Sequence, residues 1–115
     1  MGFAKELRQR RTVEAREVVV PEWGDESGAF KLYCKPITCA DLQKLQIKHP
    51  NFLENTTIEA MVDLIIIKAL DEDGKKIFAP LQDRKDLMEE ETTVISEIAN
   101  QMFADIESQE ALAKN

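Results

Sequence analysis

The feature that most constrains the fold is the apolar segment at residues 57–70. Its apolar side chains recur at helical spacing and predict one broad stripe formed by Ile58, Met61, Val62, Ile65, Ile66, Ala69 and Leu70. At about 100° per residue, Ala60, Leu64 and Ile67 fall on the opposite side of the same helix. Little of the helix surface is therefore polar, and both sides must be covered.

Two alternatives remain open for the cover on the second side. Another element of the same domain can lie there, or a partner or second subunit can bind there. The second alternative makes Ala60, Leu64 and Ile67 candidate partner-binding residues. Under it, Leu64→Asp is expected to disrupt partner binding or self-association. Under the first alternative, the same change would unfold the isolated domain.

A β-hairpin is predicted ahead of this helix. A first strand at residues 12–20 is expected to end before Pro21, because proline lacks a backbone N–H. Alternating side chains from Phe30 to Lys35 predict the second strand, and residues 22–28 form the loop between them. Since two strands alone are marginally stable in water, the hairpin is expected to pack on helices.

Three more helices are predicted, at residues 38–49, 82–89 and 93–107. The first starts at a capping box formed by Thr38 and Asp41. A similar box, Thr56 with Glu59, is expected to open the central helix. Gly74 is expected to supply a positive φ in the acidic turn that follows that helix.

The predicted fold class is α+β and predominantly helical, with an N-terminal two-stranded β-hairpin packed on a small bundle of three to four α-helices. The expected organisation is a flexible N-terminal arm at residues 1–11, a single globular domain at residues 12–107 and a flexible C-terminal tail at residues 108–115.

Few residues are suited to catalysis or metal binding. The single histidine, His49, is expected at a helix end, where a protonated imidazole interacts favourably with the helix dipole. Cys34 and Cys39 would need two further ligands to hold zinc and are expected to be free thiols, with Cys34 packed as a small hydrophobe. The turn at residues 71–74 does not fit a calcium loop, because Ala69 and Pro80 would stand where carboxylates are required. We therefore expect no enzyme activity, metal or cofactor.

The net charge of −7 restricts the partners. An acidic surface repels phosphate backbones and anionic lipid, so neither nucleic acid nor a membrane is expected. Residues 1–11 lack the apolar run of a secretory signal, so the cytoplasm is the expected location. Trp23, in the predicted hairpin loop, is either a lid on the core or an exposed partner-binding anchor.

The order of these elements resembles the tail assembly chaperones of long-tailed (siphovirus-type) bacteriophages and prophages. Three stretches carry the resemblance, and a last amphipathic helix follows them. The stretches are Val18-Val19-Val20-Pro21-Glu22-Trp23-Gly24, Lys35-Pro36-Ile37-Thr38 and Asp71-Glu72-Asp73-Gly74-Lys75-Lys76-Ile77-Phe78. The resemblance covers roughly residues 12–107.

This resemblance implies a binding role in the cytoplasm of the bacterial host. Such chaperones bind the tape measure protein, keep it soluble and help recruit tail tube subunits, and they are not retained in the mature virion. A homo-oligomer is compatible with this role. The alternatives are a minor tail or head-tail completion structural protein, which would stay in the virion, and a bacterial acidic adaptor domain.

The resemblance further implies a longer form made by a programmed frameshift. Ala113-Lys114-Asn115 is what GCA-AAA-AAC would encode, and that string contains a slippery heptamer.

Overall fold

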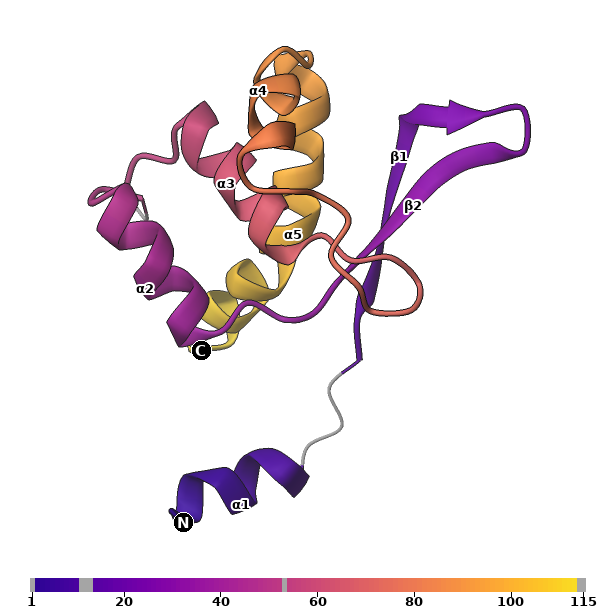
Figure 1. Ribbon diagram of the computed structural model, residues 1–115. Coiled ribbons are helices and arrows are strands. Elements are labelled where there is room, and N and C mark those ends of the chain that lie inside the picture. Colours follow the sequence, from indigo (N-terminus) through magenta and orange to yellow (C-terminus); the bar gives the residue numbers. More distant parts are fainter. Residues whose placement is uncertain (1, 11–13, 53, 114–115) are drawn as a thin grey trace.

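The computed structural model describes residues 2–10, 14–52 and 54–113, with side chains described as far as Phe103. Its elements are, in chain order, α1 (Phe3–Arg10), β1 (Arg16–Asp25), β2 (Gly28–Cys34), α2 (Cys39–Lys48), α3 (Ile58–Lys68), α4 (Gln82–Met88) and α5 (Thr92–Ala113). The β1–β2 hairpin lies beside a bundle formed by α2 to α5 (Figure 1). The predicted α+β, predominantly helical fold class is confirmed.

Helix α3 is the centre of the bundle and contacts α2, α4 and α5. It begins after Thr57, whose hydroxyl accepts a hydrogen bond from the Ala60 N–H at 3.1 Å. The predicted capping box of Thr56 and Glu59 was therefore wrong by one residue. The Thr56 hydroxyl instead donates to the Phe52 carbonyl at 2.9 Å and fixes the loop before the helix.

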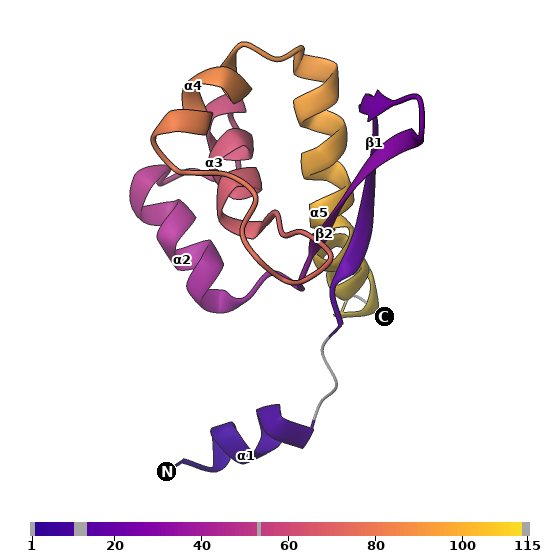
Figure 2. The ribbon, with the colours of Figure 1, turned by 45° about the vertical axis from the view of Figure 1, so that its right-hand side comes forward.

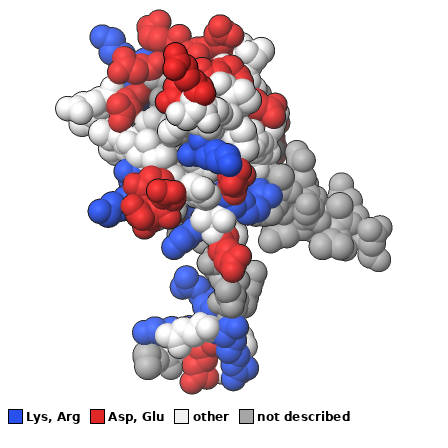
Figure 3. Space-filling view, turned by 90° about the vertical axis from the view of Figure 1, so that its right-hand side faces the viewer, with Lys and Arg blue, Asp and Glu red and all other residues white. Residues whose placement is uncertain are grey.

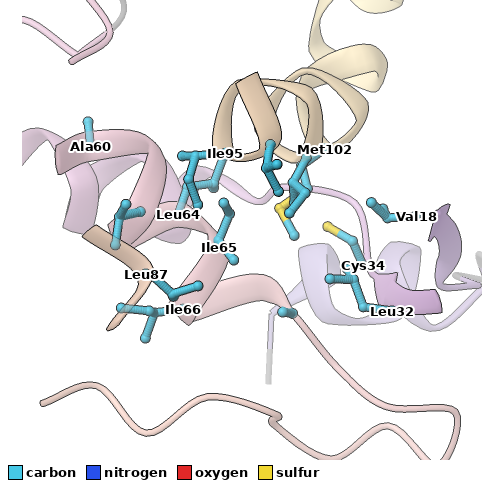
Figure 4. Packing of buried hydrophobic residues seen from close by; sticks show 14 of the residues in the cluster. Val18, Leu32, Cys34, Ala60, Leu64, Ile65, Ile66, Leu87, Ile95 and Met102 are labelled. Carbon is cyan, nitrogen blue, oxygen red and sulfur yellow. The ribbon is translucent and has the colours of Figure 1, made fainter. Parts of the chain in front are cut away.

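The core is built around α3. Side chains from α3, α4, α5 and the hairpin meet in one apolar cluster (Figure 4). The largest fully buried side chains are those of Phe52, Leu32, Leu45, Leu64, Ile65, Ile95, Ile98, Met102, Val18, Val20 and Val62. Cys34 is buried among them, as predicted, and Cys39 is exposed; neither is in a disulfide.

The two strands reach further toward the turn than predicted, while β1 begins at Arg16 and residues 12 and 13 lie outside the described part. Val18 pairs with Leu32 and Val20 with Phe30, and β1 then continues through Pro21 to Asp25. The predicted strand end at residue 20 and the loop at 22–28 were wrong. The pairing of β1 with β2 is irregular between Val20 and Asp25. Pro21, which has no N–H, is tolerated there because this part of the strand has no regular series of backbone hydrogen bonds. Gly24 lies within this irregular part, where a Cβ would collide with the Gly28 carbonyl.

A glutamine side chain joins the hairpin to α5. The Gln101 amide nitrogen donates to the Val19 carbonyl at 3.2 Å, and its amide oxygen accepts from the Val19 N–H at 3.3 Å. Arg16 donates to the Gln101 carbonyl at 2.6 Å. The side chain thus pairs with the outer edge of β1, whose backbone groups need partners.

The segment after α3 returns to the hairpin. Leu70 and Tyr33 exchange two backbone hydrogen bonds of 2.8 Å, which adds a short bridge to β2. Gly74 has a φ of 83°, which confirms the predicted turn. Ile77 and Phe78 then pack against the core.

The remaining helices match their predicted positions closely. The capping box of Thr38 and Asp41 at the start of α2 is confirmed, and α4 is one residue shorter than predicted. Helix α5 runs to Ala113, past the expected end at residue 107, and residues 114 and 115 lie outside the described part. Helix α1 has no buried residue and stands apart from the body in both ribbon views (Figures 1 and 2).

Candidate functional site

A groove opens between α2, α3 and α4, with a cavity volume of about 210 Å³. Its apolar lining comes from Leu45, Ile66 and Ile67, with Pro80 and Leu81 from the segment before α4. Leu81 is 90% exposed, so a large apolar side chain stands open to solvent beside an apolar hollow. The volume lies below the roughly 300–1,000 Å³ of typical small-molecule sites, and it suits a few apolar side chains of a protein ligand.

Of the three candidate residues on the second side of α3, two are core residues. Ala60 and Leu64 are both 0% exposed. The chain's own elements cover this side of the helix, because α2, α4 and α5 all pack on α3. Burial removes Ala60 and Leu64 as surface contacts in the folded chain. Ile67 is only partly buried, and it is the candidate that lines the groove.

Asp63 lies at the base of the groove and is 6% exposed. One carboxylate oxygen is 2.7 Å from His49 Nε2 and 3.5 Å from Lys48 Nζ, while the other accepts from Arg84 Nε at 2.8 Å. Because these partners come from the end of α2 and from α4, the carboxylate holds three helices together at this point.

The surroundings of Asp63 determine its ionisation. Burial on its own would raise the pKa of this carboxyl, but hydrogen bonds from Arg84 and His49 and the positive charges of Arg84 and Lys48 outweigh it, so the pKa is lowered. The hydrogen bond to Asp63 in turn raises the pKa of Arg84. Asp63 is therefore ionised at neutral pH and keeps the groove in shape.

The role of His49 was missed by the sequence analysis. His49 does cap the end of α2, as expected, but its ring is bound to Asp63 and is mostly buried. The available signal was Asp63 itself, a carboxylate within the most apolar helix, since a buried charge requires a partner.

A second ion pair ties α2 to α3 away from the groove. Lys68 Nζ lies 2.8 Å from Asp41 Oδ2 and also donates to the Pro36 carbonyl at 3.3 Å. Burial alone would raise the pKa of Asp41, but hydrogen bonds from Lys68 and Thr38 lower it. This pair fixes the position of α2, and with it one side of the groove.

Trp23 lies in β1 and not in a loop. Its ring is 6.1 Å from the rings of Phe30 and Phe78, measured between centroids, and its indole N–H donates to Glu90 at 2.8 Å. That hydrogen bond lowers the pKa of Glu90. These contacts correspond to the first alternative, a lid on the core.

The hairpin side carries a second, larger hollow of about 680 Å³. Asp25, Asp71 and Glu72 lie in its lining, beside Trp23 and Phe30. Figure 3 views this side and shows many acidic side chains at the end of the body away from α1. Lys31 and Lys76 line the same hollow, so its border carries both signs of charge around aromatic rings that are already packed on the core.

The described ranges contain neither a metal-binding cluster nor a membrane-spanning helix. Their His, Cys, Asp and Glu residues contain no group of three or more placed to hold a metal ion. No helix in this part of the chain has the length and apolar character of a membrane span.

No family model matches the sequence, and no curated protein matches it significantly. A solved structure does match in three dimensions, that of the tail assembly chaperone of bacteriophage HK97. The match covers 89% of this chain and 94% of the HK97 chain, with a TM-score of 0.56 and 23% sequence identity. This protein thus shares its fold with the HK97 tail assembly chaperone.

Proposed function

We propose that this protein is a tail assembly chaperone of a long-tailed bacteriophage or prophage. The observation that carries the proposal is the fold shared with the HK97 chaperone over 89% of this chain. The role is a binding role without catalysis, exercised in the cytoplasm of the bacterial host. The sequence resemblance, which rests on the order of the elements and on three short stretches, supports the same conclusion.

The proposed client is the phage tape measure protein. The chaperone keeps this long apolar chain soluble, helps recruit tail tube subunits to it and is absent from the mature virion. The groove between α2, α3 and α4 supports a holding role, because an amphipathic helix binds by placing apolar side chains in such a hollow. The net charge of −7 would keep the complex dispersed.

Co-expression with the tape measure gene of the same genome tests the proposal. The wild-type chain is expected to raise the soluble fraction of the tape measure protein. Leu81→Asp, at the margin of the groove, should reduce that gain because it places a charge where an apolar side chain is to bind. The matched control is Ile47→Asp, since Ile47 is 77% exposed on α2 and does not line the groove. An unchanged tape measure solubility with the wild-type chain would contradict the proposal.

Mass spectrometry of purified virions separates the chaperone from its structural alternative. A chaperone is missing from mature particles, whereas a minor tail or head-tail completion protein is present in a fixed ratio. A longer, frameshifted form is part of the proposal as well. Reading the lysine codon of Lys114 tests it, because any codon other than AAA removes the slippery heptamer.

A further inference from the structure

The groove between α2, α3 and α4 carries a charge opposite to that of the molecule. The chain has a net charge of −7, yet the charged side chains that line the groove are Lys44, Lys48, Lys76, Arg84 and the single carboxylate Asp63. Lys44 and Lys48 are one turn apart on α2, Lys76 lies between α3 and α4, and Arg84 is on α4. Positive charge therefore enters the groove from three separate parts of the chain.

The one carboxylate in the groove does not cancel these charges for a ligand. Asp63 is 6% exposed and is bound by His49 and Arg84, with Lys48 Nζ at 3.5 Å from one of its oxygens. Arg84 is engaged by Asp63 and also lies 3.8 Å from Glu59. Lys44 and Lys76 are exposed, and the Lys48 side chain is 61% exposed. A ligand in the groove would consequently meet three accessible ammonium groups around an apolar floor, of which Lys48 is also paired with Asp63.

We propose that the groove binds a helix of a particular kind, an amphipathic helix whose apolar stripe is flanked by carboxylates. The apolar side chains fill the hollow above Ile66 and Ile67, and the flanking Asp or Glu side chains meet Lys44, Lys48 and Lys76. This inference rests on the proposed function and adds to it the chemistry of the recognised segment. It selects acidic helical segments of the client over neutral or basic ones.

The positive charge of the groove also makes the chain's own N-terminal helix, α1, an unfavourable ligand for it. Helix α1 exposes Phe3 and Leu7 at 66% and 45%, so it has an apolar face to offer. However, it carries Lys5, Arg8 and Arg10 against the single carboxylate of Glu6. Like charges across an interface are unfavourable, so an α1 from a second copy is a poor ligand for a groove that is itself cationic.

Two synthetic peptides of about 18 residues, long enough to be helical, test this inference. Both carry the same stripe of leucines, and their flanking positions are all Glu in one and all Lys in the other. Binding to the full chain is measured by fluorescence anisotropy at about 0.05 M and about 0.5 M salt, which changes the range of the charge interactions. The Glu peptide is expected to bind about tenfold more tightly at the lower salt concentration, and the difference should shrink at the higher one.

A charge-reversed variant locates the preference. Lys44→Glu with Lys76→Glu should remove the advantage of the Glu peptide. Lys31→Glu with Lys85→Glu makes the same change in net charge outside the groove and should preserve it. Circular dichroism of each variant verifies that the fold is retained. Equal binding of the two peptides, tighter binding of the Lys peptide, no binding of either, or a preference that survives in the groove variant would overturn the inference.

The outcomes distinguish this inference from the proposed function. If the chain keeps the tape measure protein soluble but shows no preference for the Glu peptide, the inference fails and the chaperone role stands. If the Glu peptide is preferred but tape measure solubility does not change, the groove does bind acidic helices and the chaperone role fails.

Discussion

At the scale of single residues, Asp63 connects the core to the groove. It is the one buried charged side chain among the residues whose side chains the structure describes. Leaving a charge of this kind unpaired costs several kcal/mol in general, and here His49, Arg84 and Lys48 all face it. Because Arg84 and Lys48 keep part of their surface in water, the net stabilisation is moderate.

The lowered pKa of Asp63 predicts a specific pH dependence. The unfolded state retains the ordinary pKa near 3.8, so the contribution of Asp63 to the unfolding free energy is fully present above that pH and is lost as the pH falls through the lower folded pKa. Asp63→Asn should lower the unfolding free energy at pH 7 by about 2 kcal/mol, because it weakens the hydrogen bonds with His49 and Arg84. The gap between the variant and the wild type should narrow below about pH 4.

Urea titrations followed by circular dichroism at pH 7, 5, 4 and 3 measure this effect. Glu72→Gln is a suitable control, because Glu72 is an exposed acidic residue on the turn after α3. A wild-type advantage that stays constant from pH 7 to pH 3 would contradict the assigned role of Asp63.

The sequence predicts buried faces better than it predicts polar partners. Helical spacing predicts the burial of Val62, Ile65 and Ile66, because the hydrophobic effect depends mainly on which side of a helix faces the core. The pairing of Asp63 with His49, 14 residues earlier, depends on how α2 is placed against α3. That placement is a tertiary result, and no local periodicity encodes it.

At the scale of elements, local sequence patterns likewise predict α3 and the hairpin but do not predict what packs against them. The two apolar sides of α3 are evident from its sequence, but whether the second side faces this chain or another depends on α2, α4 and α5 together. In the hairpin, β1 was predicted to end before Pro21, because proline usually ends a strand. The strand instead continues past Pro21, which is exposed and lies where the pairing is irregular. Ile67 was identified as a candidate contact, whereas the cations of the groove come from separate segments and were not grouped in advance.

The burial of α3 predicts how substitutions on it act. Leu64→Ala should lower the unfolding free energy by about 3 kcal/mol, because it leaves a cavity at a fully buried position. Leu64→Asp should unfold the chain, since the charge would have to be buried. Leu81→Ala, at a position that is 90% exposed, should change the unfolding free energy by less than about 0.5 kcal/mol. Urea denaturation measures all three.

A different outcome for Leu64 would restore the alternative in which a partner covers this side of α3. In that case Leu64→Ala would leave the unfolding free energy unchanged and would alter instead the mass of the particle in solution, which light scattering measures.

At the scale of the whole molecule, the chain divides into a packed body and one helix outside it. The body contains the hairpin and α2 to α5, and it holds every buried side chain that the described residues contribute. Helix α1 contributes none, and it exposes Phe3 and Leu7 on a helix that also carries three cations. The separation of residues 1–11 from a globular domain stays a prediction, and its physical basis is that α1 contributes no buried side chain.

Removal of residues 1–13 tests this separation. The shortened chain, which begins at Glu14, should have an unfolding free energy within about 0.5 kcal/mol of the full chain, because no buried contact is lost with α1. Thermal and urea denaturation measure this, and light scattering of the same samples reports self-association. If the full chain self-associates and the shortened chain forms particles with fewer subunits, Phe3 and Leu7 form an oligomer contact, since their apolar surface is exposed. A loss of more than about 2 kcal/mol would instead mean that α1 packs on the body in solution, since a segment without buried side chains cannot contribute that much stability.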